Sequence, residues 1–180
     1  MPVVGFLGAT AEAWRPRKDA FVNRLRELGW IDGRTITIEY RWDDGRSERA
    51  AQIADEFVRL KANVIVTVGS SVAPLKQATS TIPIVFAFAN DPIGGGLVAS
   101  LSRPGGNVTG LSSQAPDLAG KRLELLREVV PRLHRLAILV DIAYPAAVME
   151  MKEVQAAAQK LSADRTAGML MFSVRCESPH

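Results

Sequence analysis

The sequence predicts an α/β fold built on a parallel sheet, and three observations support this. Short apolar runs recur between residues 2 and 111, as buried parallel strands require. Between them lie segments whose apolar residues recur with helical spacing. The strict alternation of the two implies crossovers that cover both faces of one sheet. Because such crossovers are right-handed, we expect a flavodoxin-like parallel sheet with the strand order 2-1-3-4-5.

The first strand is expected over residues 2–7, a continuous apolar run. A helix is expected over residues 16–28, because apolar residues recur there at steps of three and four, and Gly29 provides a stop signal. Residues 35–40 alternate apolar and polar side chains and are expected to form the second strand. Ser47 is expected to cap a second helix that runs to residue 60.

The alternation continues to residue 111. Later strands are expected over residues 63–68, 82–88 and 107–111, and later helices over residues 70–80 and 91–101. Asp91-Pro92 is a typical helix start, and Pro104-Gly105-Gly106 is a typical stop. Five strands with helices between them make up the expected sheet.

We expect a first α/β unit over residues 1–114 and a second, smaller one over residues 115–180. In the second part, helices are expected over residues 117–130 and 146–161, and strands over residues 136–140 and 168–174. A piece of this size buries a small share of its surface and would be marginally stable alone. It is therefore expected to lean on the first lobe or on another chain.

Composition and charge exclude several classes of protein. The 180 residues include 22 basic and 19 acidic side chains, for a net charge of +3. The basic residues are scattered among acidic ones, which is typical of a solvated surface and not of a nucleic-acid-binding face. No apolar run approaches the roughly 20 residues of a membrane-spanning helix. One cysteine and two histidines argue against an internal disulfide and against a metal site.

The glycines form no cofactor-binding motif. Gly94-Gly95-Gly96 follows a proline that starts a predicted helix, and it lacks the G-x-G-x-x-G spacing of a dinucleotide fingerprint. No P-loop lysine motif occurs either. We therefore expect no cofactor.

Candidate ligand-binding residues follow the predicted strands, because ligands of open parallel sheets bind at the carboxyl ends of the strands. They are Gly8, Ala9, Thr10, Gly69, Ser70, Ser71, Asn90, Asp91, Ser112, Ser113, Asp141 and Tyr144. The small residues after the first strand allow close approach of a ligand, and the serines after the third strand suit a carboxylate. Asp91 would pair with a ligand ammonium group, and Tyr144 would cap the ligand from the second lobe.

Each of these residues also has a purely structural interpretation. Thr10 would lie in a plain turn, and the serines that follow the third strand would cap a helix. Asp91 before a proline is itself a typical N-cap. Ser112 and Ser113 would belong either to a hinge that touches the ligand or to a solvated linker.

Several motifs resemble one protein family. They are Ile31-Asp32-Gly33-Arg34, Ile38-Glu39-Tyr40-Arg41-Trp42, Asp91-Pro92-Ile93, Gly120-Lys121-Arg122-Leu123 and, most specifically, the run Pro104-Gly105-Gly106-Asn107-Val108-Thr109-Gly110. Over about residues 3–162 the chain resembles the ABC-transporter substrate-binding proteins related to the tryptophan/tyrosine-binding lipoproteins.

This resemblance implies a type I periplasmic-binding-protein fold, in which two lobes hold a small polar, amino-acid-like metabolite between them. It also implies delivery of that solute to ABC permease subunits, a periplasmic or membrane-anchored extracytoplasmic location, and no catalysis. The chain opens without a signal peptide, and after Leu161 it departs from the family pattern. The resemblance therefore implies a complete N-terminal ligand-binding lobe over residues 1–114 and a partial second lobe over residues 115–180, as in a C-terminally truncated form.

Two alternatives stay open. An enzyme on a flavodoxin-like or Rossmann-like sheet is compatible with the architecture, because a fold does not determine a function. A dimerising ligand-sensing or structural domain is the other, in which the incomplete second lobe would form a homodimer contact.

Overall fold

The computed structural model describes residues 1–113, 118–130, 133, 135–140, 145–163 and 170–175. The chain divides into two units. The first unit comprises Met1–Ala89 and Gly96–Ser112, and the second comprises Asn90–Gly95 and Ser113–His180. Residues 90–95 thus group with the second unit, although they lie within the N-terminal part of the sequence.

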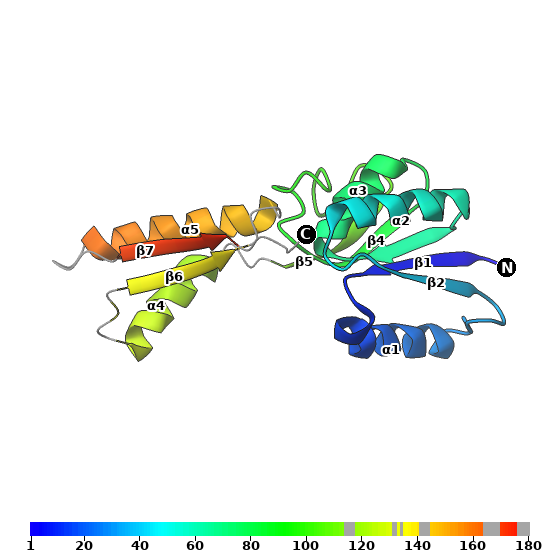
Figure 1. The fold of residues 1–180 in the computed structure, drawn as a ribbon, viewed down its shortest axis with the longest axis horizontal. Helices are drawn as coiled ribbons and strands as arrows, with labels where there is room; N and C mark the ends of the chain where they lie inside the picture. Colours follow the sequence, from blue (N-terminus) through cyan, green and yellow to red (C-terminus); the bar gives the residue numbers. More distant parts are fainter. Residues whose placement is uncertain (114–117, 131–132, 134, 141–144, 164–169, 176–180) are drawn as a thin grey trace. The chain divides into compact units, whose positions relative to one another are not determined.

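A five-stranded sheet with the order β2-β1-β3-β4-β5 confirms the predicted topology (Figure 1). Its strands are β1 (Val3–Gly8), β2 (Thr37–Trp42), β3 (Val64–Thr67), β4 (Ile84–Asn90) and β5 (Val108–Ser113). β1 pairs in parallel with β2 on one side and with β3 on the other. Phe6 therefore lies opposite both Tyr40 and Val66, on a strand that is paired on both sides.

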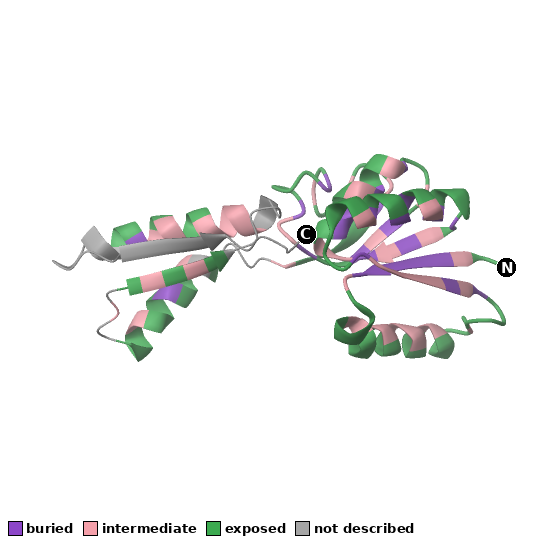
Figure 2. Cartoon of the chain, viewed as in Figure 1, coloured by how far each residue is buried: buried purple, intermediate pink, exposed green. Residues whose placement is uncertain are grey.

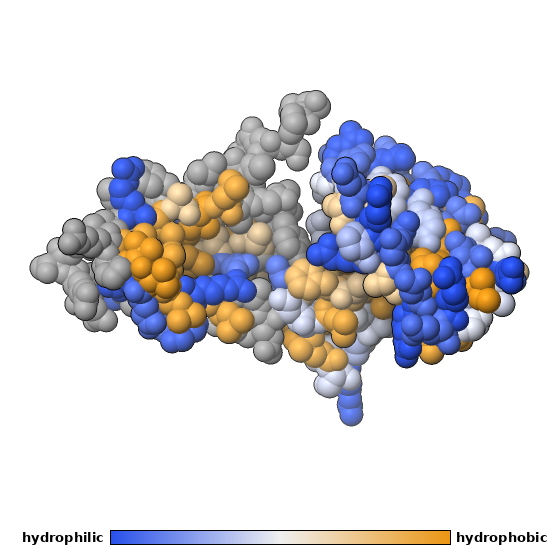
Figure 3. Space-filling model, turned by 90° about the horizontal axis from the view of Figure 1, so that it is seen from below, coloured by the Kyte–Doolittle hydropathy of each residue, from blue (hydrophilic) through white to orange (hydrophobic). Residues whose placement is uncertain are grey.

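Helices cover the two faces of this sheet unequally. The helix α1 (Ala11–Glu27) lies on one face, whereas α2 (Ser47–Arg59) and α3 (Val72–Ala78) lie on the other (Figure 1). A short 3₁₀ helix, η1 (Gly69–Ser71), leads into α3. Seen from the α1 side, the first unit presents hydrophilic residues with hydrophobic ones beside them (Figure 3).

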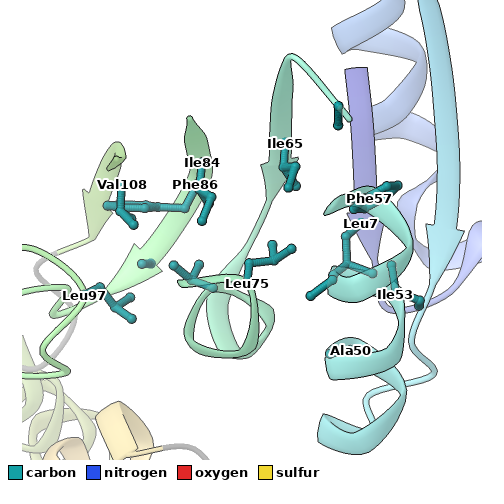
Figure 4. Packing of buried hydrophobic residues seen from close by; sticks show 14 of the residues in the cluster. Leu7, Ala50, Ile53, Phe57, Ile65, Leu75, Ile84, Phe86, Leu97 and Val108 are labelled. Carbon is teal, nitrogen blue, oxygen red and sulfur yellow. The ribbon is translucent and has the colours of Figure 1, made fainter. Parts of the chain in front are cut away.

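The main core lies between the sheet and the pair α2 and α3 (Figure 4). Phe57 of α2 and Leu75 of α3 are fully buried against strand residues such as Ile65 and Ile84. Full burial of a side chain of this size contributes about 1.5–3 kcal/mol. This core therefore fixes the positions of the strand ends that carry the candidate site.

A second cluster lies under α1 and is more open. Phe6 is its buried centre, and partly buried residues of α1 and β2 pack around it. α1 has no fully buried residue (Figure 2). Since the helix contributes only half-buried side chains, its attachment depends on the aromatic contacts described below.

Two predicted helix boundaries were wrong. α1 begins at Ala11, before the predicted start at residue 16, because Thr10 provides the cap and Pro16 lies inside the helix. Ser47 was expected to be an N-cap, but it is the first residue of α2, after Arg46. In both places a strong local signal was present, but α1 begins before Pro16 and α2 begins at Ser47 itself.

The predicted helix over residues 91–101 is also wrong, because turns occupy this segment. Asp91 has a φ of +39° and Gly96 a φ of +68°, which a right-handed helix does not contain. Leu97 and Val98 nevertheless lie in the main core. Three consecutive glycines disfavour a helix, and the loop is held by the burial of these two residues and by hydrogen bonds from Nζ of Lys76 to the carbonyls of Gly96 and Leu97.

β5 runs to Ser113 and therefore includes both serines that were expected to follow it, in a hinge or in a linker. Its Gly110 lies so close to β4 that a Cβ atom there would collide with the carbonyl oxygen of Phe86. Burial in β4 does not alternate strictly, since Ala87 and Phe88 are both exposed while Phe86 and Ala89 are buried. β4 is thus well covered at Ile84 and Phe86 but uncovered at Ala87 and Phe88.

The second unit contains the predicted helices and strands. They are α4 (Ala119–Val129), β6 (Arg135–Val140), α5 (Pro145–Ala163) and β7 (Leu170–Arg175). β6 and β7 pair in parallel. Arg122 of α4 donates to Glu150 of α5 at 2.7 Å, while Leu123 and Ala158 are buried. The pairing of β6 with β7, this ion pair and the buried apolar side chains all contribute to holding the unit together.

Candidate functional site

The predicted ligand-binding residues of the first unit lie at the carboxyl edge of its sheet. Gly8 is the last residue of β1, and Gly69–Ser71 follow β3. Because β1 and β3 are parallel neighbours, their carboxyl ends lie side by side. The structure therefore brings together the first two predicted loops.

The loop after β1 changes from buried to exposed along three residues. Gly8 is buried, Ala9 is half-buried and Thr10 is exposed. Thr10 is the N-cap of α1, and its Oγ1 accepts a hydrogen bond from the Ala13 amide at 3.3 Å. The amides and the positive end of the dipole of a long helix therefore lie at this edge.

The loop after β3 places two serines in different environments. Gly69 has a φ of +50°, which reverses the chain into η1. Ser70 is exposed, whereas Ser71 is only 5% exposed and its Oγ donates to Oδ2 of Asp43 at 2.5 Å. Of the two hydroxyls, the one on Ser70 is therefore the one that faces solvent.

Asp43 was not predicted as a functional residue, and it connects three loops. It directly follows β2 and is only 3% exposed. Its backbone amide donates to the carbonyl of Gly8 at 3.0 Å, and its Oδ1 accepts from the Gly45 amide at 2.8 Å. With the bond from Ser71, the loops after β1, β2 and β3 form one hydrogen-bonded unit.

Two tryptophans border the end of β1. Trp14 lies in the first turns of α1 and Trp42 ends β2, and both rings contact Phe6. The guanidinium of Arg17 lies 5.4 Å from the centre of the Trp14 ring. Trp14 lies in the first turns of the helix that Thr10 caps and Trp42 is the last residue of β2, so both rings lie beside the site.

The surroundings of two titratable side chains on β2, Tyr40 and Arg41, raise their pKa values. Burial raises the pKa of the Tyr40 hydroxyl, and the carboxylates of Asp32 and Asp19 raise it further. A hydrogen bond to Glu56 raises the pKa of the Arg41 guanidinium, with a smaller contribution from Glu39. Arg41 therefore stays charged and balances two carboxylates beside the sheet.

The residues predicted to follow the fourth and fifth strands fall on both units, and Asn90, Ser112 and Ser113 belong to the ends of β4 and β5 themselves. Asn90 and Asp91 group with the second unit, as does Ser113, whereas Ser112 is an exposed residue of the first unit. Oδ1 of Asp91 accepts from the Gly94 amide at 2.8 Å, which is the local bond of a capping residue. No helix follows it, so the carboxylate closes a turn instead.

Two buried side-chain atoms, at the ends of β3 and β4, have no hydrogen-bond partner among the described residues. They are the buried Oγ1 of Thr67 in β3 and Oδ1 of Asn90 in β4. The predicted residues Asp141 and Tyr144 lie outside the described residues.

The described part of the chain contains no group of three or more histidine, cysteine, aspartate or glutamate residues arranged to hold a metal ion. Within the same part, no helix has both the length and the apolar character needed to cross a membrane.

Comparisons with known proteins show what this architecture is similar to. The model of a family described as "ABC transporter substrate binding protein" matches residues 11–165. A curated relative, the tyrosine-binding protein of Clostridioides difficile, is 31% identical over 125 residues. That alignment covers 69% of this chain and 36% of the relative.

Solved structures match over nearly the whole chain. A conserved domain protein from Vibrio cholerae has a TM-score of 0.85 and 28% identity, over 97% of this chain and 57% of that one. An ABC domain from Streptococcus pneumonia, solved in complex with L-Trp, has a TM-score of 0.83 and 24% identity, over 98% and 58%. The chain thus spans little more than half the length of these structures.

Proposed function

The chain belongs to the family of ABC transporter substrate-binding proteins and has the type I periplasmic-binding-protein fold, and from this premise we propose that it binds the solute of an ABC importer. In this proposal a small polar, amino-acid-like metabolite binds between the two units. The protein acts outside the cytoplasm, in the periplasm or anchored to the membrane, and passes the solute to permease subunits. No residue has a catalytic role.

One observation supports the part of the binding site that the first unit would contribute. The exposed hydroxyls of Thr10 and Ser70 lie at the ends of neighbouring parallel strands, beside the N-terminus of α1. Hydroxyl donors and a helix N-terminus together suit a carboxylate. A free amino acid carries such a group, and the curated relative is named for binding tyrosine.

The other predicted residues have supporting roles in this proposal. Gly8 and Ala9 leave the strand end without bulky side chains, and Gly69 forms the turn that presents Ser70. Asn90, Asp91 and Ser113 would contribute from the second unit, together with Asp141 and Tyr144, and Ser112 would contribute from the end of β5.

A thermal-shift assay with L-tyrosine and L-tryptophan tests this function. A ligand at about 100 times its Kd stabilises the folded state by about 2.7 kcal/mol. At about 2–4 °C per kcal/mol for a chain of this size, we expect Tm to rise by about 5–11 °C. A cooperative melt that no amino acid shifts would contradict the proposal.

Two matched variants test the location of the site. Ser70→Ala removes the exposed hydroxyl at the carboxyl edge, and we expect it to reduce the ligand-induced shift. Ser80→Ala removes another exposed serine hydroxyl, just before β4 at the opposite edge of the sheet. We expect Ser80→Ala to leave the shift unchanged, and equal shifts in both variants would argue against binding at Ser70.

Homodimer formation stays a prediction. Light scattering over a range of concentrations tests it, and a monomer throughout would remove it.

A further inference from the structure

We propose that Asp43 is a positioning residue that fixes the Gly69–Ser71 turn, and through it the exposed Ser70 hydroxyl, at the carboxyl edge of the sheet. The part of this inference that concerns ligand binding rests on the proposed function. Asp43 itself faces away from solvent, so its effect on binding is exerted through Ser71.

Both carboxylate oxygens of Asp43 have a defined donor. Oδ2 accepts from the Ser71 hydroxyl and Oδ1 accepts from the Gly45 amide. A buried carboxylate is costly to desolvate unless it is hydrogen-bonded, so its burial here requires both donors to stay in place. The side chain thereby connects two loops that are separated by 28 positions in sequence.

The turn that carries Asp43 is held in an uncommon backbone conformation. Asp44 has a φ of +53° and Gly45 a φ of +72°. The amide of Asp44 donates to the carbonyl of Ala9 at 2.9 Å, and the amide of Arg46 donates to the carbonyl of Asp43 at 2.9 Å. Residues in left-handed conformations persist where surrounding contacts determine them, so this turn forms a rigid support for Ser71.

The consequence for binding is preorganisation. If the turn after β3 is already held in place, a ligand does not have to order it, and the affinity is higher for the same contacts. Loss of Asp43 would leave the Ser71 hydroxyl and the Gly45 amide without their acceptor, and the turn would open more often.

Amide hydrogen exchange in the ligand-free chain tests the positioning role directly. The amide of Ser71 donates to the carbonyl of Val68 at 3.2 Å, and the amide of Val72 donates to the carbonyl of Gly69. In Asp43→Ala we expect these two amides to exchange about tenfold faster, which corresponds to about 1.4 kcal/mol. In Asp43→Asn we expect wild-type rates, because the amide group can accept from Gly45 and donate to Ser71 Oγ.

Thr79→Ala is the matched control for general loss of stability. Thr79 is buried, and its Oγ1 accepts from the amides of Thr81 and Ile82 near the start of β4, away from the site. We expect this variant to melt at a lower temperature without selective acceleration at Ser71 and Val72. Unchanged rates at these amides in Asp43→Ala, or the same acceleration in Thr79→Ala, would overturn the proposal.

Calorimetric titration with L-tyrosine and L-tryptophan extends the test to binding. We expect Asp43→Ala to bind about tenfold more weakly than Thr79→Ala, and Asp43→Asn to recover the wild-type Kd. Equal Kd values for all three variants would overturn the link to binding. A wild type that binds no amino acid would contradict the proposed function, and the exchange rates would still decide the positioning role.

Discussion

A Cβ atom on Gly8 would lie 2.8 Å from Cζ3 of Trp42, so the end of β1 and this indole ring leave no room for a side chain between them. Trp14 approaches the same point, with its Cγ at 3.1 Å. Gly8 was predicted as a place where a ligand approaches the backbone. The structure shows that two tryptophan rings already use the space that the missing side chain leaves.

Gly8→Ala is therefore expected to destabilise the fold by about 1–3 kcal/mol, the usual cost of inserting a methyl group into a filled site. Urea unfolding followed by tryptophan fluorescence would measure it. Gly106→Ala is the control, because a Cβ atom there would meet nothing within 4 Å. Its effect should stay within about 0.5 kcal/mol, and equal effects of the two substitutions would contradict this explanation.

Phe6 is the centre of the cluster under α1, and its replacement by alanine should weaken that cluster severely. Its ring centre lies 5.6–6.1 Å from those of Trp14, Phe21, Tyr40 and Trp42. Phe6→Ala is expected to cost about 3–5 kcal/mol in the free energy of unfolding. Chemical denaturation measures this loss.

Phe88→Ala provides the comparison for Phe6→Ala. Phe88 lies in β4 and is 49% exposed, so its truncation should cost less than about 1 kcal/mol. If both phenylalanine variants unfolded at the same denaturant concentration, the aromatic cluster would not be the element that holds α1.

Much of the first unit was predictable because each strand is a short apolar run bounded by turn residues. Residues 63–68 contain β3, whose alternate residues Ile65 and Thr67 are buried. The strand order followed from handedness rules and not from any single residue. The same reasoning failed over residues 91–101. Asp91-Pro92 favours a helix start, but Gly94-Gly95-Gly96 disfavours a helix, and the segment forms turns.

The candidate site was predictable only in part. The rule that ligands bind at strand ends directed attention to Thr10 and Ser70, which lie on adjacent strands. It could not separate Ser70 from Ser71, because their difference depends on the distant Asp43. A hydrogen bond between loops that are far apart in sequence has no local signature, so only the folded structure displays it.

Asn107 explains part of the Pro104–Gly110 run on which the family resemblance was based. Its Nδ2 donates to the carbonyls of Thr79 and Ile82, at 3.0 and 2.8 Å, and so joins the start of β5 to the segment before β4. Asn107→Ala would leave both carbonyls without this donor. We expect a loss of about 1–3 kcal/mol in the free energy of unfolding, measured by urea denaturation.

Asn23→Ala is the control for Asn107→Ala. Asn23 is an exposed residue of α1, and alanine is the better helix former, so its effect should lie within about 0.5 kcal/mol. A loss in Asn107→Ala no larger than this would mean that the two carbonyls are satisfied without the asparagine.

Tyr40 should make the fold less stable at alkaline pH. Burial raises the pKa of its hydroxyl, and Asp32 and Asp19 add to this, so the native state holds the proton more tightly than the unfolded chain does. Above the ordinary tyrosine pKa of about 10 the unfolded state releases the proton first, so the free energy of unfolding falls as pH rises. The contribution is therefore present below this pH and is lost above it.

Tyr40→Phe cannot ionise, and its stability relative to the wild type should increase between about pH 9 and about pH 11. Urea midpoints of both proteins at the two pH values measure the difference, in which the other titrating groups cancel. A difference that stays constant, or that changes in the opposite direction, would show that the native environment does not favour the neutral phenol.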